Sequence, residues 1–220
     1  MYINKSRCEH LMAKIKLFID FDDTLFDRNA FRDDLFAVMG SLGPTEAELK
    51  TSYQAVYADG YAGPMAQLTY INENIEPIDL AVSKQKIDGF LADTSKYLYP
   101  KSIEFLESID RTKYCPNLLT VGGVEFQKAK VCNSGIEKYF DECYYSAENK
   151  AKALRNLVDL DEKFILIDDK DRELSKVAEN FENAIVIKAE PEKLLGSAEG
   201  DVTVPGEGDR SVTSGQNPIN

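Results

Sequence analysis

Four carboxylates follow one short apolar segment near the start of the sequence. The run Leu17–Ile19 has the composition and length of a buried strand, and it is followed by Asp20, Asp22, Asp23 and Asp27. Like charges gathered at the end of a buried strand repel one another and raise one another's pKa values. We therefore expect the fold to bring positive charge to this point.

Two further apolar segments end in polar groups of a similar kind. Thr120 lies at the end of one of them, and Asp168 and Asp169 lie at the end of another. Ligand sites in open parallel sheets lie at the carboxyl ends of the strands, so we expect these groups to meet Asp20 and Asp22 at one edge. A hard, all-oxygen site suits Mg²⁺. The sequence thus predicts a Mg²⁺ site that is assisted by a lysine.

Strand and helix patterns alternate along most of the chain. Short apolar runs predict strands at residues 16–20 and in the segments NLLTVG, ECYYS, KFILIDD and AIVIKA. Helical spacing fills most of the intervals, including ENKAKALRNLVDL, and the capping pair Thr45 and Glu48 opens one of the helices. This alternation predicts an α/β fold in which a parallel sheet is covered by helices on both faces.

The same patterns divide the chain into four parts. Residues 1–13 are interpreted as a leader, because Met12 would itself make a sensible protein start. Residues 14–27 and 98–195 form the predicted catalytic core, and the helical block 28–97 is an insertion after its first strand. Residues 196–220 are rich in Gly, Ser and acidic residues and poor in apolar ones, which predicts a disordered tail.

Composition excludes several classes of function. The chain has 220 residues and a net charge of −12, which disfavours binding to nucleic acid or to an anionic membrane surface. Its single histidine, His10, lies in the leader, so no Ser-His or Cys-His pair and no His-based zinc site is expected in the folded body. Four cysteines without CxxC spacing and the lack of a signal-peptide pattern predict reduced thiols and a cytoplasmic protein.

Several of these segments resemble one known family. FIDFDDTLFD is similar to the first motif of the haloacid dehalogenase-like (HAD-like) superfamily, an apolar strand followed by Asp-x-Asp-x-Thr/Val. Thr120 in NLLT and the segment FILIDDKDRE are similar to the second and fourth motifs. The likeness covers roughly residues 15–189. It implies a Rossmann-like sheet with a helical cap, residues 28–97, inserted after the first motif.

The resemblance also implies a chemistry for particular residues. Asp20 would be the nucleophile that attacks phosphorus and becomes an aspartyl-phosphate. Asp22 would protonate the leaving oxygen and then deprotonate the attacking water, and Thr120 would hydrogen-bond the transferring phosphoryl group. A carboxylate is a competent nucleophile without activation, which fits a folded body that lacks histidine.

The family's lysine and metal ligands can be placed in the same way. Lys150, in SAENKAKAL, is the best match for the lysine that neutralises the phosphoryl group, with Lys152 and Lys128 as alternatives. The family's metal ligands, carried over in the same way, would hold Mg²⁺ between Asp20, the backbone carbonyl of Asp22, Asp169 and the nearby Asp168.

The sequence departs from the family pattern in two places. The second motif reads Thr-Val-Gly-Gly, where the family often has Asn after the hydroxyl residue, and Lys150 is not followed by the usual Pro. Arg28 and Arg32, which follow the first motif, are expected to pair with acidic neighbours or solvent rather than with substrate.

The expected function is that of a Mg²⁺-dependent phosphatase acting on a small phosphorylated metabolite. A phosphomutase of the same superfamily, which shares all four motifs, stays open. A dehalogenase would not need the second acid, Asp22. A receiver-like phospho-Asp signalling or binding protein fits the long helical insertion poorly.

Overall fold

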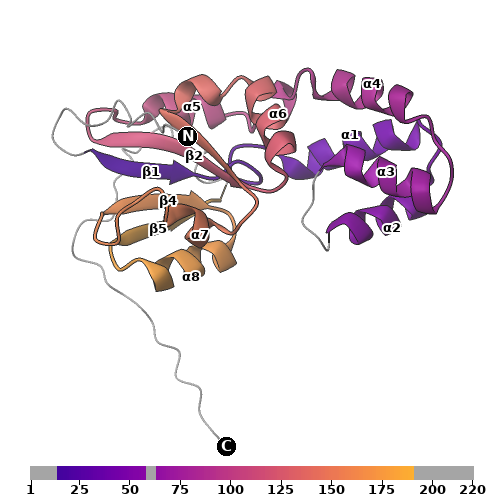
Figure 1. Cartoon of the computed structure of the whole chain (residues 1–220). Coiled ribbons are helices and arrows are strands. Elements are labelled where there is room, and N and C mark those ends of the chain that lie inside the picture. Colours follow the sequence, from indigo (N-terminus) through magenta and orange to yellow (C-terminus); the bar gives the residue numbers. More distant parts are fainter. Residues whose placement is uncertain (1–13, 58–62, 191–220) are drawn as a thin grey trace, which may run out of the picture.

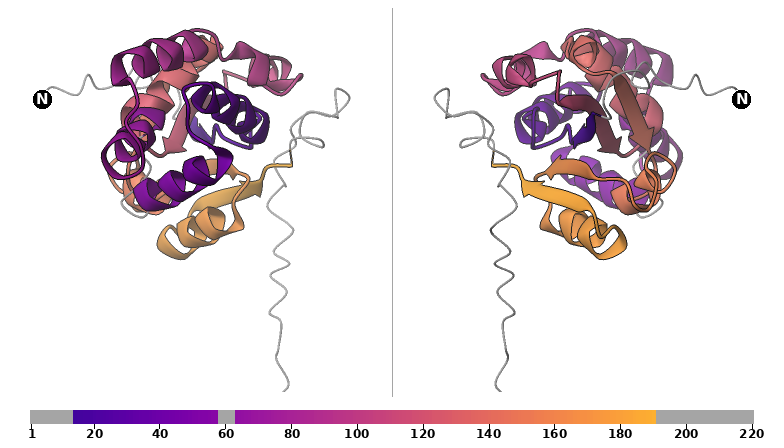
Figure 2. Two further views of the ribbon diagram at one scale, coloured as in Figure 1. Left: turned by 90° about the vertical axis from the view of Figure 1, so that its right-hand side faces the viewer. Right: turned by 90° about the vertical axis from the view of Figure 1, so that its left-hand side faces the viewer.

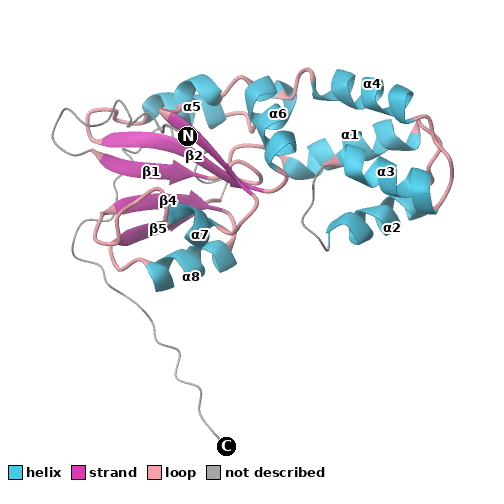
Figure 3. Cartoon of the chain, in the orientation of Figure 1, coloured by secondary structure: helices cyan, strands magenta, loops and turns pink. Residues whose placement is uncertain are grey.

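The computed structural model describes residues 14–57 and 63–190, so the predicted leader 1–13 and tail 196–220 lie outside the described residues. Its centre is a five-stranded parallel sheet of order β3-β2-β1-β4-β5 (Figures 1 and 3). The strands are β1 Ile15–Ile19, β2 Tyr114–Val121, β3 Glu142–Ser146, β4 Phe164–Asp168 and β5 Ala184–Lys188. The predicted α/β fold with a parallel sheet is confirmed.

Alternate residues of the strands face two separate apolar layers. Ile19 of β1 and Ile165 of β4 pack into one layer, whereas Phe18 and Leu166 of the same strands pack into the other. This period of two is expected for strands buried on both faces. The first layer is covered by α5 (Ser102–Ser108) and α6 (Val124–Ser134), and the second by α7 (Lys150–Leu154) and α8 (Asp171–Asn180).

Four helices lie between β1 and α5 in the chain. They are α1 (Arg28–Gly40), α2 (Glu46–Tyr57), α3 (Pro64–Asn74) and α4 (Leu80–Leu91), and a short 3₁₀ turn at Ser95–Tyr97 follows them. Thr45 and Glu48 form the predicted reciprocal cap: the Thr45 amide donates to Glu48 Oε2 at 2.7 Å, and the Glu48 amide donates to Thr45 Oγ1 at 3.3 Å.

The four helices form a unit at one end of the sheet. The arrowheads of β1, β2 and β4 point toward it in Figure 1, and the left view of Figure 2, which faces this end, shows the helices in front of the strands. We call helices α1–α4 the helical insertion. Its position places it on the side of the sheet where the carboxyl ends of the strands lie.

Two predicted elements have different lengths in the structure. Strand β2 begins at Tyr114, before the predicted NLLTVG segment, and includes Pro116. Helix α7 ends at Leu154 instead of running through the whole predicted pattern. Beyond Leu154 the chain forms a turn, in which the amides of Leu157 and Val158 both donate to the Leu154 carbonyl, at 2.9 and 3.0 Å. Among the helices of the described ranges, none has the length and apolarity needed to span a bilayer, and the cytoplasmic location stays a prediction.

Candidate active site

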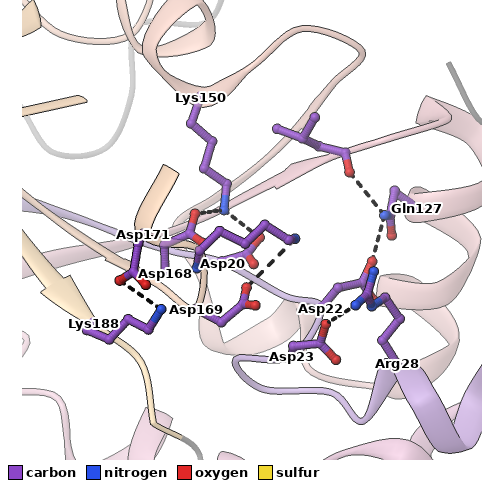
Figure 4. A network of polar contacts seen from close by, with 12 residues as sticks. Asp20, Asp22, Asp23, Arg28, Gln127, Lys150, Asp168, Asp169, Asp171 and Lys188 are labelled. Carbon is purple, nitrogen blue, oxygen red and sulfur yellow. Dashed lines mark hydrogen bonds and ion pairs between the residues drawn. The ribbon is translucent and has the colours of Figure 1, made fainter. Parts of the chain in front are cut away.

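The central strand and its neighbour bring three carboxylates together. Asp20 follows β1 and Asp168 ends β4, and these strands are paired, with the Asp20 amide donating to the Ile167 carbonyl at 2.9 Å. One carboxylate oxygen each from Asp20, Asp168 and Asp169 lies within 4.8 Å of the others (Figure 4). Asp20 and Asp168 are almost completely buried. The strand ends therefore meet as the sequence predicts.

Lys150 is the lysine that the fold brings to these carboxylates. It is the first residue of α7, where the Asn149 side chain caps the helix by accepting from the Lys152 amide at 3.1 Å. The Lys150 Nζ lies 2.6 Å from Asp20 Oδ1 and also contacts Asp168 Oδ2, and its side chain is only 2% exposed. The buried Lys150 ammonium therefore supplies part of the positive charge that the three carboxylates require.

The two alternative lysines lie elsewhere. Lys152 is exposed and its Nζ pairs with Glu148 at 3.5 Å, one helical turn away. Lys128 is exposed on α6. Of the three candidates, only Lys150 reaches the acidic cluster within the described residues.

The acidic cluster is still short of hydrogen-bond donors. Asp168 is satisfied, because Oδ1 accepts from the Lys170 amide at 2.8 Å and Oδ2 contacts Lys150. Asp20 Oδ2 and Asp169 Oδ1 are buried and have no hydrogen-bond partner within the described ranges. The Lys170 Nζ lies 3.7 Å from Asp169 Oδ1, beyond hydrogen-bond distance. Buried carboxylate oxygens without donors are costly unless a cation reaches them.

The pKa values of Asp20 and Asp169 also indicate that positive charge is lacking near these carboxylates. Burial, assisted by the negative charge of Asp168, raises the pKa of Asp20 above its ordinary value even though Lys150 opposes the shift. Burial and the charges of Asp20 and Asp168 raise the pKa of Asp169 to about 7 against the opposing charge of Lys170. The residues present therefore fit a divalent cation bound between Asp20 and Asp169, since such an ion would supply the missing charge.

Asp22 lies on the other side of Asp20 and is not part of that cluster. Its Oδ2 accepts a hydrogen bond from Gln127 Nε2 at 2.8 Å (Figure 4). Its Oδ1 contacts the Nζ of Lys130. Burial alone would raise the pKa of Asp22, but the charge and hydrogen bond of Lys130 outweigh it and hold the pKa below its usual value. The predicted metal ligand of Asp22 is its backbone carbonyl, and that role stays a prediction.

Gln127 and Lys130 are functional candidates that the sequence interpretation missed. Both lie on the buried face of α6, together with Ser134. Residues spaced by three and four share one helix face, and an apolar residue is the usual occupant of a face that packs on a sheet. Polar residues in that stripe were therefore a readable signal of a buried polar network.

The second motif brings Thr120 to the strand-end edge, and its first glycine lies against Gln127. Register pairs Ile19 with Leu118, so the buried Thr120 lies at the same edge as Asp20 on the neighbouring strand. Gly122 has a φ of 153°, and a Cβ there would lie 2.9 Å from Gln127 Nε2. The glycine thus leaves room for the amide that reaches Asp22.

The two arginines after the first motif pair with acidic neighbours, as predicted. Arg28 Nη2 lies 2.7 Å from Asp23 Oδ2 (Figure 4), and Asp23 itself has a φ of 61°. Arg32 Nη2 lies 3.3 Å from Asp33 Oδ1. Arg28 is the first residue of α1. Burial alone would lower the pKa of its guanidinium, but the charges of Asp23, Asp22 and Asp169 outweigh burial and raise that pKa.

Solved structures with a similar fold were found, whereas no protein-family model and no curated protein sequence matches the chain. A protein from Burkholderia xenovorans described as a haloacid dehalogenase-like hydrolase aligns with a TM-score of 0.65 at 19% identity, over 80% of this chain and 81% of that one. A HAD family enzyme from Bacteroides thetaiotaomicron, a magnesium complex, aligns with a TM-score of 0.54 at 18% identity, over 80% and 94%. An L-2-haloacid dehalogenase from Xanthobacter autotrophicus aligns with a TM-score of 0.52 at 14% identity, over 80% and 77%.

Proposed function

We propose that this chain, which has the fold of the haloacid dehalogenase-like hydrolases, is a Mg²⁺-dependent phosphatase that hydrolyses a small phosphomonoester in the cytoplasm. The observation that carries the proposal is Asp20. It is buried at the end of the central strand, with one oxygen paired to Lys150 at 2.6 Å and the other without a hydrogen-bond donor. A carboxylate held in this way keeps an electron pair available for attack on phosphorus.

The reaction would proceed in two steps, phosphoryl transfer to Asp20 and hydrolysis of the aspartyl-phosphate. A carboxylate oxygen of Asp20 attacks phosphorus, the phosphorus–oxygen ester bond breaks, and the leaving oxygen takes a proton from Asp22. Asp22 acts in this step in its protonated form, which is the minor form because Lys130 holds its pKa below the usual value. Water then attacks the phosphorus of the aspartyl-phosphate and gives a proton back to Asp22. The bond between Asp20 and phosphorus breaks, which releases inorganic phosphate and restores the carboxylate.

Other residues would hold the phosphoryl group in place. Lys150 would offset its negative charge beside Asp20, and the Thr120 hydroxyl would hydrogen-bond one of its oxygens. Mg²⁺ would be held by Asp20 and Asp169, with Asp168 and the backbone carbonyl of Asp22 nearby, and would supply neutralisation of the phosphoryl oxygens. The two donor-free oxygens of the cluster support this assignment.

The fold alone does not select a phosphatase over a dehalogenase, because an L-2-haloacid dehalogenase has a similar structure. Asp22 favours the phosphatase. Its buried carboxylate is held by two donors from α6, and a displacement of halide needs no proton on the leaving group. An acid at this point is useful when the leaving group is an alkoxide.

Release of inorganic phosphate from a panel of phosphate esters tests the proposal. We expect hydrolysis in Mg²⁺, none in EDTA, and recovery when Mg²⁺ is added back. 2-Haloacids serve as the competing substrates, and transfer of the phosphoryl group to a second position of a sugar phosphate would reveal a mutase. Halide release without phosphate release, or ester hydrolysis that is insensitive to EDTA, would overturn the proposal.

A further inference from the structure

We infer that Gln127 and Lys130 of α6 are positioning residues, which fix the Asp22 carboxylate in the orientation needed for proton transfer. This inference rests on the proposed phosphatase activity and deepens it. It assigns a catalytic purpose to two buried polar side chains that do not belong to the acidic cluster of Asp20, Asp168 and Asp169.

The first observation is that each Asp22 oxygen has its own donor. Gln127 Nε2 donates to Oδ2 at 2.8 Å, and the Lys130 Nζ contacts Oδ1. Two donors on two oxygens fix the rotation of a carboxylate about its last torsion, which is otherwise broad. Each oxygen still has a second lone pair, so Asp22 can exchange a proton with a leaving group or water while it stays held.

The second observation is that the two donors are themselves held. Gln127 Oε1 accepts from the Lys130 Nζ at 3.2 Å, and Gln127 Nε2 also donates to the Val121 carbonyl at 3.3 Å. Asp22, Gln127 and Lys130 thus form a closed triangle that is tied to the end of β2. Gly122 is part of this arrangement, since a side chain at this position would collide with the Gln127 amide.

The third observation is that Lys130 is enclosed by aromatic rings. Its Nζ lies 5.0–5.5 Å from the centroids of four phenylalanine rings, and its side chain is 2% exposed. The rings belong to Phe21, Phe26, Phe31 and Phe126. Ring faces stabilise a cation but block its access to solvent and to substrate. Lys130 is therefore placed to act through Asp22 and not by touching a substrate.

The triangle benefits catalysis by fixing the orientation of the Asp22 carboxylate. A buried ion pair adds little net stability compared with apolar residues of the same volume, so stability alone is a weak reason for an ammonium in this position. A proton donor or acceptor must lie within hydrogen-bond reach of its target, and a displacement of about 1 Å can cost about 100-fold in rate. The triangle prevents such a displacement of Asp22.

Two variants of the full-length protein test the inference. Gln127→Leu removes one donor without changing charge, and Lys130→Met removes the other inside the ring cage. We expect kcat/KM for an alkyl phosphate to fall about 10- to 100-fold in each, and kcat/KM for p-nitrophenyl phosphate to fall much less, because its leaving group needs little protonation. Lys128→Met, an exposed lysine on the same helix, is the matched control and should match the unmodified protein.

A double-mutant cycle identifies the residue through which the effect acts. In an Asp22→Asn background, Gln127→Leu should cause no further loss on the alkyl phosphate, since the group that it positions is already gone. Far-UV circular dichroism and thermal unfolding establish that each variant is folded. If Lys130→Met does not fold, the charge-neutral Gln127→Leu decides the question alone.

The outcomes separate the inference from the proposed function. Equal losses on both esters, unchanged activity in a folded Gln127→Leu protein, or a full additional loss in the Asp22→Asn background would overturn the positioning role while the phosphatase stands. An unmodified protein that hydrolyses neither ester in Mg²⁺ would overturn the function, and the inference would fall with it.

Discussion

Two buried lysines stand on opposite sides of the first motif, and their surroundings differ. Lys150 pairs with Asp20 and Asp168, in a cluster where two buried carboxylate oxygens have no hydrogen-bond partner within the described residues. Lys130 pairs with Asp22, whose two oxygens both have donors. Both side chains are 2% exposed. The two regions have the same kind of ion pair but a different balance of charge.

The difference indicates how each region is used. A polar cluster that lacks donors is completed by a ligand, so the Lys150 region is the place for a cation and a phosphoryl group. A cluster whose donors and acceptors match needs nothing more, so the Lys130 region is suited to holding a side chain still.

The largest effect is expected in the Lys150 region. Asp20→Asn keeps the shape of the side chain but removes the nucleophile, so turnover should fall on the order of 10⁴-fold or more. Phosphate release and circular dichroism measure activity and folding together. Substantial phosphatase activity in a folded Asp20→Asn protein would contradict a mechanism that proceeds through an aspartyl-phosphate.

A smaller and selective loss is expected from the acid in the other region. Asp22→Asn should slow hydrolysis of alkyl phosphates about 10²- to 10⁴-fold, the usual contribution of general acid–base catalysis. Formation of the phosphoenzyme from p-nitrophenyl phosphate should suffer less than its hydrolysis. Burst kinetics separate the two steps, and unchanged turnover of both kinds of ester would contradict the role.

Stability measurements should separate the two lysines directly. Lys130→Met leaves a buried carboxylate without its partner and should cost about 3–5 kcal/mol in the free energy of unfolding. Lys150→Met leaves Asp20 and Asp168 without their ammonium, so it should bind Mg²⁺ more tightly than the unmodified protein does. Added Mg²⁺ should then restore part of its loss relative to the unmodified protein, by about 1.4 kcal/mol for each tenfold fall in the dissociation constant.

Denaturant unfolding with and without Mg²⁺ checks this contrast. The unmodified protein and Lys130→Met should gain nearly equally from the ion, because Lys130 pairs with Asp22 and not with a carboxylate of the acidic cluster. A larger gain by Lys130→Met than by Lys150→Met would reverse the assignment of the two regions.

The smallest effect is expected from the helical insertion. We propose that it covers the strand ends and selects the organic part of the ester, since α1 starts directly beyond the first motif. Arg28→Met should alter the ratio of kcat/KM between large and small esters by a few-fold and leave acetyl phosphate nearly unaffected. Arg32→Met, exposed and paired with Asp33, is the control.

Much of the fold could be predicted from the sequence, because strands buried on both faces have short apolar runs that are hard to mistake. The runs before Asp20 and before Asp169 are of this kind, and both are strands in the sheet. Strand β2 was underestimated at its start, since Pro116 is a residue that usually argues against an interior strand.

The sequence predicts only those site residues that lie at the ends of strands. Asp20, Asp168 and Asp169 follow from the rule that parallel strands end at one edge. The donors to Asp22 did not follow, because Gln127 lies more than a hundred positions from its partner and only the packed position of α6 brings the two together. The sequence of a helix does not indicate which strand its polar residues will face.

The position of β1 in the sheet has a consequence for how the protein is made. The strand that carries Asp20 is synthesised first but is the central one, and its two neighbours, β2 and β4, come from far along the chain. Contacts between distant segments form slowly, whereas the helices between β1 and β2 have their partners close by in sequence. During synthesis the helical insertion can therefore fold while β1 still waits for both neighbours. Until Asp168 has left the ribosome and β4 has paired, the nascent chain has the nucleophile but no reaction centre around it.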